Sequence, residues 1–258
     1  MKEIILQLPT PLELLLDPLS LTVLASYALL ILWEEVFPAR KLPKVRFWRI
    51  KGLVFFFVFF FVASYLPILI DPVLAEFQVF DLTNLGVVTS SLIGLIIYEL
   101  VIYLYHVTMH KYDFLWRTFH QVHHSAERLD AYGSLFHSPL DMVGFTLVGS
   151  VSFALLLGLP AQTITILLFI INFLAFFQHA NIKTPRWIGY LVQRPESHSI
   201  HHGRGIHKNN YADLPLIDMV FGTFQNPENY QKETGFYDGA SQRIIDMLCF
   251  KDVSTPKK

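Results

Sequence analysis

The sequence predicts an all-α integral membrane protein with about four transmembrane helices, including a hairpin. This fold class rests on an apolar composition, on long uncharged runs and on one strongly basic connection. Hydrophobic residues make up 53% of the chain and charged residues only 16%, whereas soluble domains carry about 25% charged residues. The formal net charge of −1 indicates no nucleic-acid partner.

Three uncharged runs are expected to cross the bilayer, because about 20 mostly apolar residues span its hydrocarbon core. They are residues 18–33, 53–70 and 82–98. The third helix is expected to continue through Glu99 to His110. The phenylalanine-rich stretch 55–61 has no polar face, which argues against the alternative of a helix buried in a water-soluble core.

A hairpin is expected between Asp141 and His179, where residues 142–178 carry no formal charge. At 1.5 Å per residue this run amounts to about 55 Å of helix, which is enough for two passes. The segment Gly158-Leu159-Pro160 is the expected break between them.

Basic residues predict how these helices are oriented. The connection after the first run is basic and holds Arg40, Lys41, Lys44, Arg46, Arg49 and Lys51. The next connection has no Lys or Arg and holds Asp71, Glu76 and Asp81. Cytoplasmic connections are enriched in Lys and Arg, so the first connection is expected inside the cell. Counting the passes from there brings His106, His110 and His179 to the cytoplasmic side.

Two further features of the sequence concern a signal peptide and sites built from cysteine. Only Lys2 is basic at the extreme N-terminus, so no cleaved signal peptide is expected. The single cysteine, Cys249, excludes an internal disulfide and any Cys-x-x-Cys metal site.

Histidines are the chemically informative residues. Nine of the eleven lie in two short windows, 106–124 and 198–207. One pair is spaced i, i+4 and two triplets have the form His-x-x-His-His, so each set is expected on one helical face. These eight residues are His106, His110, His120, His123, His124, His198, His201 and His202. Neutral imidazole is a common ligand of Fe, Zn, Cu and Ni, and eight ligands exceed the needs of one ion. The pattern therefore predicts two metal ions. For His137 and His207 taken singly, a surface or hydrogen-bonded role is the simpler interpretation.

Carboxylates are missing from these clusters. There is no His-Glu-x-x-His motif and no Glu-x-x-His motif of the soluble di-iron bundles. Carboxylates outside the clusters are expected to orient the rings. The candidates are Glu99, Asp130, Glu196, Asp213 and Asp218, each of which is equally compatible with a surface charge or a helix cap.

These residues resemble the fatty acid hydroxylase/sterol desaturase superfamily of membrane di-iron enzymes. The resemblance covers roughly residues 85–226 and is carried by the three histidine motifs, by Gln178-His179-Ala180-Asn181, by Asn210-Tyr211 and by the segment 218–224. It implies a membrane anchor with a cytosolic histidine-rich helical cap. The expected organisation is an N-terminal transmembrane region at 1–84, a catalytic domain at 85–226 and a polar tail at 227–258 that covers the cap.

The resemblance also implies an activity. Members bind two metals, taken to be iron in the active form, and use O2 to hydroxylate or desaturate lipids such as sterols or fatty acyl chains. For this chain, two iron ions are expected, and zinc could replace them in purified protein. The chain has no haem-binding or ferredoxin-like segment, so electrons are expected from a separate reductase protein. The implied metal ligands are His106, His110, His120, His123, His124, His179, His198, His201 and His202. No catalytic residue beyond these ligands is implied.

One position departs from the family pattern. Some fatty acid hydroxylases have a further histidine four residues after the one that matches His179, and this chain has Lys183 there. The tenth ligand is then missing or is replaced by Asn181, His137, His207 or water, and the sequence does not choose among these alternatives.

Two other functions fit part of the pattern. A membrane zinc hydrolase acting on a lipid ester or phosphate would use imidazole ligands to activate water, but the clusters lack a carboxylate base. A metal transporter would place its ligands near the middle of the bilayer, whereas these histidines lie at or beyond the ends of the expected spans.

Overall fold

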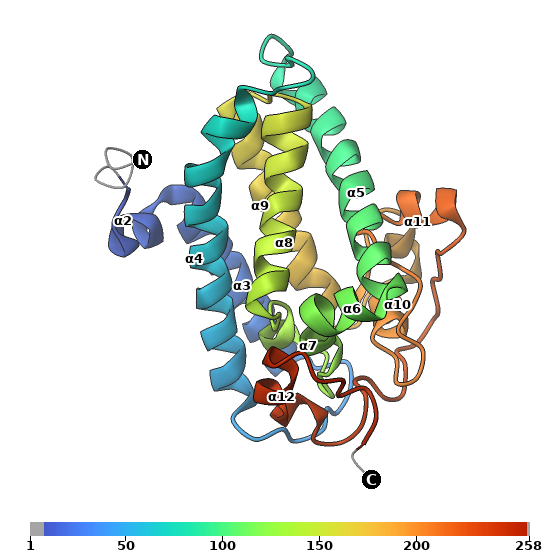
Figure 1. Cartoon of the computed structure of the whole chain (residues 1–258). Coiled ribbons are helices and arrows are strands. Elements are labelled where there is room, and N and C mark those ends of the chain that lie inside the picture. The colour runs from blue at the N-terminus through green and yellow to red at the C-terminus, as the bar shows by residue number, and fades with distance from the viewer. Residues whose placement is uncertain (1–7, 257–258) are drawn as a thin grey trace.

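The computed structural model describes residues 8–256, so Lys2, Lys257 and Lys258 lie outside the described residues. All regular elements within that range are helices (Figure 1), and five of them are long and apolar enough to cross a membrane. They are α3 (Pro18–Val36), α4 (Trp48–Ala75), α5 (Val87–Lys111), the continuous span Pro139–Leu156 that begins with α8 (Pro139–Ser150), and α9 (Ala161–His179). The predicted all-α membrane fold is confirmed, and the hairpin supplies two of the five helices.

The hairpin breaks where the sequence predicts. α8 continues into a π-helical turn, Val151–Leu156, and α9 begins at Ala161. Gly158 between them has a φ of +51°, a left-handed conformation that glycine adopts without steric cost.

The third span begins later than the uncharged run suggests, at Val87 instead of Leu82. The Asp81 carboxylate accepts hydrogen bonds from the backbone N–H of Thr83 at 3.0 Å and from its hydroxyl at 2.6 Å. This local turn competes with helix formation, so residues 82–86 stay outside α5.

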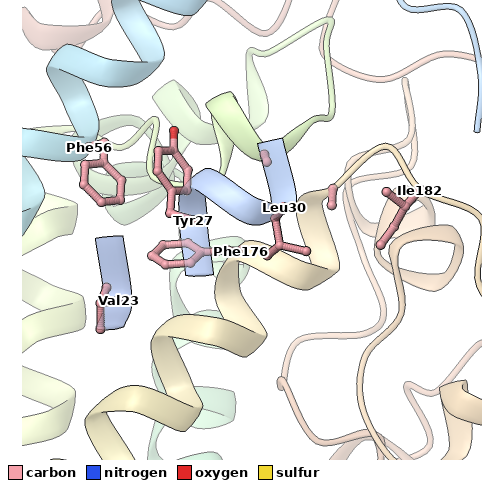
Figure 2. Close-up of a cluster of buried hydrophobic side chains, with 8 residues drawn as sticks. Val23, Tyr27, Leu30, Phe56, Phe176 and Ile182 are labelled. Carbon is pink, nitrogen blue, oxygen red and sulfur yellow. The ribbon is translucent and has the colours of Figure 1, made fainter. Parts of the chain in front are cut away.

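The helices pack as a bundle around an aromatic core. α3 contacts α9, α4 contacts α8, and α5 contacts both arms of the hairpin. Figure 2 shows the core where α3, α4 and α9 meet, with the rings of Tyr27, Phe56 and Phe176 next to one another. The rings of Tyr27 and Phe56 are stacked with centroids 4.2 Å apart, and Phe176 lies 5.1 Å from Tyr27. Close packing of this kind, more than the hydrophobic effect, holds helices together in lipid.

A buried carboxylate near the end of α3 ties two loops to this bundle. Glu34 is 5% exposed and accepts hydrogen bonds from the backbone N–H groups of Ala131 and Asn181, both at 2.9 Å. These loops lead away from the two segments that carry His124 and His179. Glu34 thus fixes the bundle relative to both.

Short helices and the C-terminal segment gather at one end of the bundle. They are α6 (Asp113–Leu115), α7 (Gln121–His124), α10 (Pro195–His201) and α12 (Ile244–Leu248), with α11 (Pro215–Phe221) beside α5 (Figure 1). The C-terminal segment covers α7: the Gln121 side chain donates to the carbonyl of Lys251 at 3.0 Å and accepts from the N–H of Val253 at 3.2 Å. This end of the bundle, together with its short helices, is called the cap below.

Candidate metal centre

Four helical segments deliver histidines to the junction between the bundle and the cap. α5 carries a pair near its C-terminal end, and α9 carries His179 as its last residue. α10 carries His198 and His201, and His202 follows directly as its C-cap. The first triplet begins at the end of a π-helical turn, Trp116–His120, and continues into α7. π-Helical turns occur often at functional sites, and this one positions His120.

The structure brings all nine predicted histidines together in two groups. Within each group, one side-chain nitrogen from every residue lies within 4.8 Å of the others. The five-histidine group is His106, His110, His120, His124 and His201, and the four-histidine group is His123, His179, His198 and His202. All are buried except His110, which is half-buried. The groups lie at the ends of the spans, away from the mid-bilayer position that a transporter would need.

The triplets do not each serve one group, contrary to the expectation of a single face. Residues spaced i, i+4 share a group, as His120 and His124 do, whereas the i+3 histidine, His123, belongs to the other group. α10 follows the same rule with His201 as the odd member. Adjacent residues of a helix point about 100° apart, so neighbouring histidines face two different centres.

The spacing within each group suits shared metal ions. In the five-histidine group, the Nε2 atom of His106 lies 2.9 Å from that of His120 and 3.0 Å from that of His201. In the four-histidine group, the Nε2 atoms of His179 and His198 are 3.1 Å apart. Metal–imidazole bonds of about 2.0–2.1 Å at right angles would place two ligand nitrogens about 3.0 Å apart.

Unpaired nitrogens give a second test of the fit. The Nε2 atoms of His110 and His124 are buried and have no hydrogen-bond partner among the described residues. A buried polar atom without a partner is costly, and a metal ion would supply the missing partner. The residues present therefore fit two metal ions.

The electrostatics of the cap favour neutral rings. Burial, and then the neighbouring imidazoles, lower the pKa of His123, His124, His198, His201 and His202 well below the usual 6.5. At neutral pH these imidazoles hold a free lone pair, which is the form that binds metals.

A single loop orients most of the five-histidine group through its backbone. The Nδ1–H of His106 donates to the carbonyl of Tyr211 at 2.7 Å, and that of His201 donates to the carbonyl of Asn209 at 2.8 Å. His207 acts twice: its carbonyl accepts from His110 at 3.0 Å, and its Nδ1 lies 3.1 Å from the Nδ1 of His124.

This 207–211 loop has an uncommon backbone. His207, Asn209 and Asn210 have φ values of 43°, 69° and 52°, a left-handed region that few residues other than glycine adopt. The Asn210 side chain holds the shape: it donates to the carbonyls of Ser197 and Gln225 at 2.8 and 3.0 Å and accepts from the N–H of Gln225 at 2.7 Å.

The fifth ring of this group is oriented by Asp141, a residue that sequence analysis missed. Its Oδ2 accepts from the Nδ1 of His120 at 2.7 Å and from the Nδ1 of His137 at 2.8 Å, while its Oδ1 accepts from the Tyr105 hydroxyl at 3.0 Å. These three residues, His120, His137 and Asp141, also lie close enough to hold an ion. Because the His120 Nε2 faces the five-histidine group, however, its Nδ1 is better explained as a hydrogen-bond donor.

A signal for Asp141 was present in the sequence. Ser138-Pro139-Leu140-Asp141 is a helix start, with the Ser138 hydroxyl accepting from the N–H of Asp141 at 3.2 Å. His137 and Asp141 are four residues apart, a spacing that places side chains on one face.

The carboxylates proposed from sequence serve the scaffold and do not orient rings. Glu99 accepts from the backbone N–H groups of Asp213 and Leu214, both at 2.9 Å. Asp213 accepts from the Gln178 amide at 2.6 Å, and its burial raises its pKa to about 7. Asp218 accepts from the N–H groups of Tyr211 and Ala212, both at 2.9 Å. The expectation for these three residues was wrong, although they shape the segment that carries the orienting carbonyls.

The remaining two candidate carboxylates accept hydrogen bonds from groups other than the clustered histidines. Asp130 accepts from the Trp48 indole at 2.8 Å, and Glu196 accepts from the Thr184 hydroxyl at 2.6 Å. Neither interaction involves an imidazole.

The residues considered for a tenth ligand all lie outside the five- and four-histidine groups. Lys183 is exposed. The Asn181 amide donates to the carbonyl of Arg40 at 2.8 Å. His137 stacks on His123 with centroids 4.0 Å apart and donates to Asp141. His137 and His207 each contact a histidine of a group, and neither belongs to the five- or the four-histidine group.

Comparisons with known proteins give the family of this chain. The fatty acid hydroxylase family matches residues 91–223. The chain is 24% identical over 169 residues to the very-long-chain aldehyde decarbonylase GL1-5 of Oryza sativa subsp. indica, a match that covers 61% of this chain and 27% of that protein. It is 28% identical over 139 residues to the ornithine lipid hydroxylase OlsE of Rhizobium tropici, covering 52% and 41%. It is 27% identical over 158 residues to the protein CER1-like 2 of Arabidopsis thaliana, covering 54% and 24%.

The matched segments span less than half the length of these relatives. No solved structure matches the chain. The family match covers 91–223, more than half of the chain, and all nine clustered histidines lie within it. The chain belongs to the fatty acid hydroxylase family.

Proposed function

We propose that this protein is an O2-dependent di-iron membrane oxidoreductase that hydroxylates or desaturates a lipid. The observation that carries the proposal is the convergence of nine imidazoles into two adjoining groups where apolar spans meet the cap. A site made of neutral nitrogen ligands suits iron. The proposed ligands are His106, His110, His120, His124 and His201 for one ion and His123, His179, His198 and His202 for the other.

The residues of the chain have three tasks in this proposal. The imidazoles hold the ions, the 207–211 loop and Asp141 fix the orientation of five rings, and the packed cap keeps water away from the buried nitrogens. The bound irons would supply the oxidising chemistry with O2 and electrons, and a separate reductase protein would deliver the electrons. Residues 85–226 form the proposed catalytic domain, with residues 1–84 as its membrane anchor and residues 227–258 as a covering tail.

A lipid substrate fits the location of the site. Relatives are named for action on an ornithine lipid and on very-long-chain aldehydes, and both names point to molecules with long chains. We infer a substrate with a long hydrocarbon chain that enters from the bilayer. The cap lies on the cytoplasmic side in this proposal, because the exposed residues Lys41, Lys44 and Arg46 follow the first span at the histidine-bearing end.

The test is to load the metal-free protein with ferrous iron under argon and then add O2, a reductant and a lipid extract. The expected product gains one oxygen atom or loses two hydrogen atoms, as measured by mass spectrometry. The controls are His202→Ala protein and zinc-loaded protein, both without product. Lipid hydrolysis by the zinc form in the absence of O2 would instead identify a hydrolase.

A further inference from the structure

The two histidine groups differ in how their rings are supported. In the five-histidine group every Nδ1 has a hydrogen-bond partner: three backbone carbonyls, the Asp141 carboxylate and the His207 ring. In the four-histidine group only His179 has one, the carbonyl of Ala175 at 2.6 Å. The Nδ1 atoms of His123, His198 and His202 are buried without a partner among the described residues.

This difference bears directly on metal affinity. A hydrogen bond from Nδ1–H fixes the tautomer that leaves the Nε2 lone pair free, holds the ring in place and makes the ligand more basic. Loss of one such partner typically lowers metal affinity about 10–100-fold. The four-histidine group has one fewer ligand and lacks this support on three of its four rings.

We propose that the two metal sites are unequal: the five-histidine group binds its ion first and tightly, and the four-histidine group holds a second, exchangeable ion. This inference rests on the proposed function, since it takes both groups to be metal sites. It assigns the 207–211 loop and Asp141 as the positioning residues of the tight site. The expected affinity ratio is at least about 10-fold.

The arrangement of α10 offers a matched pair of variants. His201 and His202 are adjacent, are 0% and 1% exposed, and belong to different groups. Removing one or the other deletes a single ligand from a different site while changing the C-terminal end of α10 by the same number of atoms.

The experiment titrates the metal-free, full-length protein in lipid nanodiscs with Co²⁺, and follows absorbance and bound metal. The wild type should bind two ions in two resolved steps, and a chelator should remove one ion much faster than the other. His202→Ala should keep the tight step and lose the weak one. His201→Ala should weaken the tight step instead.

Asp141→Asn provides a variant that keeps all nine imidazoles. It should weaken the tight step about 10–100-fold and leave the weak step unchanged. Two ions of equal affinity and equal release rate in the wild type would overturn the inequality while leaving the proposed function standing. Loss of the tight step in His202→Ala would overturn the assignment of the groups. A protein that binds no ion would overturn both proposals.

Discussion

His124 and His202 stack face to face, with ring centroids 4.3 Å apart and planes inclined by 11°. The first belongs to the five-histidine group and the second to the four-histidine group. The two candidate sites are therefore in direct contact through one pair of stacked imidazole rings.

The first prediction concerns one ligand from each group. His106→Ala and His202→Ala should each abolish turnover, because the proposed reaction needs both ions and each change removes one proposed ligand. Both proteins should still enter the membrane fraction, since the apolar spans are untouched. Full turnover in either variant, measured by product formation per mole of membrane-inserted protein, would show that the residue is not a ligand.

A second prediction concerns the loop that supports the rings. Asn210→Ala removes three buried hydrogen bonds and places alanine at a φ of 52°. Each intramolecular hydrogen bond contributes about 0.5–1.5 kcal/mol net, so the loss of three should lower the free energy of unfolding by about 1.5–4.5 kcal/mol. Asn210→Gly, which tolerates the left-handed backbone, should be milder.

The measurement is the denaturation midpoint in detergent, with bound metal determined alongside. The exposed loop residue Asn84 lies outside the histidine cap, and Asn84→Ala should match the wild type. A wild-type midpoint in Asn210→Ala would mean that the loop keeps its shape without this side chain.

A third prediction tests the tie between α3 and the cap. Glu34→Leu leaves the N–H groups of Ala131 and Asn181 without their acceptor, at about 1–3 kcal/mol for each group. Its neighbour Glu35 is a matched control, because it is more exposed and pairs with Arg49; such surface pairs contribute about 0–1 kcal/mol. Thermal unfolding should therefore shift strongly for Glu34→Leu and weakly for Glu35→Leu, and equal shifts would argue against this role.

A fourth prediction follows from the lowered pKa values of the cap histidines. Burial keeps His123, His124, His198, His201 and His202 neutral in the folded protein and lowers the pKa of His207 to about 4. In the unfolded chain they take up protons below the usual 6.5. The unfolded state therefore binds more protons, and stability falls as the pH drops below about 6.5.

Unfolding midpoints of metal-free protein at a series of pH values provide the measurement. The contribution of these groups should be constant between pH 8 and 7 and should decline below pH 6.5. Metal-loaded protein should also release its ions in acid, because protons compete for the same nitrogens. The raised pKa of Asp213 acts in the opposite direction, because the folded protein then binds the extra proton. In Asp213→Asn protein, a midpoint that rises on acidification would contradict the neutral, buried state of the rings.

Much of this architecture is encoded locally and was predictable. The uncharged runs predict the spans, and the segment Gly158-Leu159-Pro160 predicts the break in the hairpin. Counting the membrane passes predicts that the histidines gather at one end of the bundle. α5 begins at Val87, later than the uncharged run predicts, because Thr83 donates a hydrogen bond to Asp81 in a local turn. A hydropathy pattern contains no information about such a turn.

The outer part of the site was harder to predict because much of it is backbone. The acceptors for His106, His110 and His201 are carbonyl oxygens, which every residue carries and no sequence pattern marks. The exchange of His123 and His201 between groups depends on how α7 and α10 meet, which is a tertiary property. The role of Asp141 was predictable from its spacing to His137, because residues four apart at a helix start lie on one face.

The exchange of histidines between α7 and α10 has a consequence for how the protein matures. Each group draws on residues from both ends of the matched region: His106 with His201 in one, and His123 with His202 in the other. Neither site can be completed until α10 has been synthesised and docked beside α5, since their rings meet only then. Metal binding would therefore have to follow the docking of α10, and the bound ions would act as cross-links that close a chain segment of about a hundred residues against unfolding.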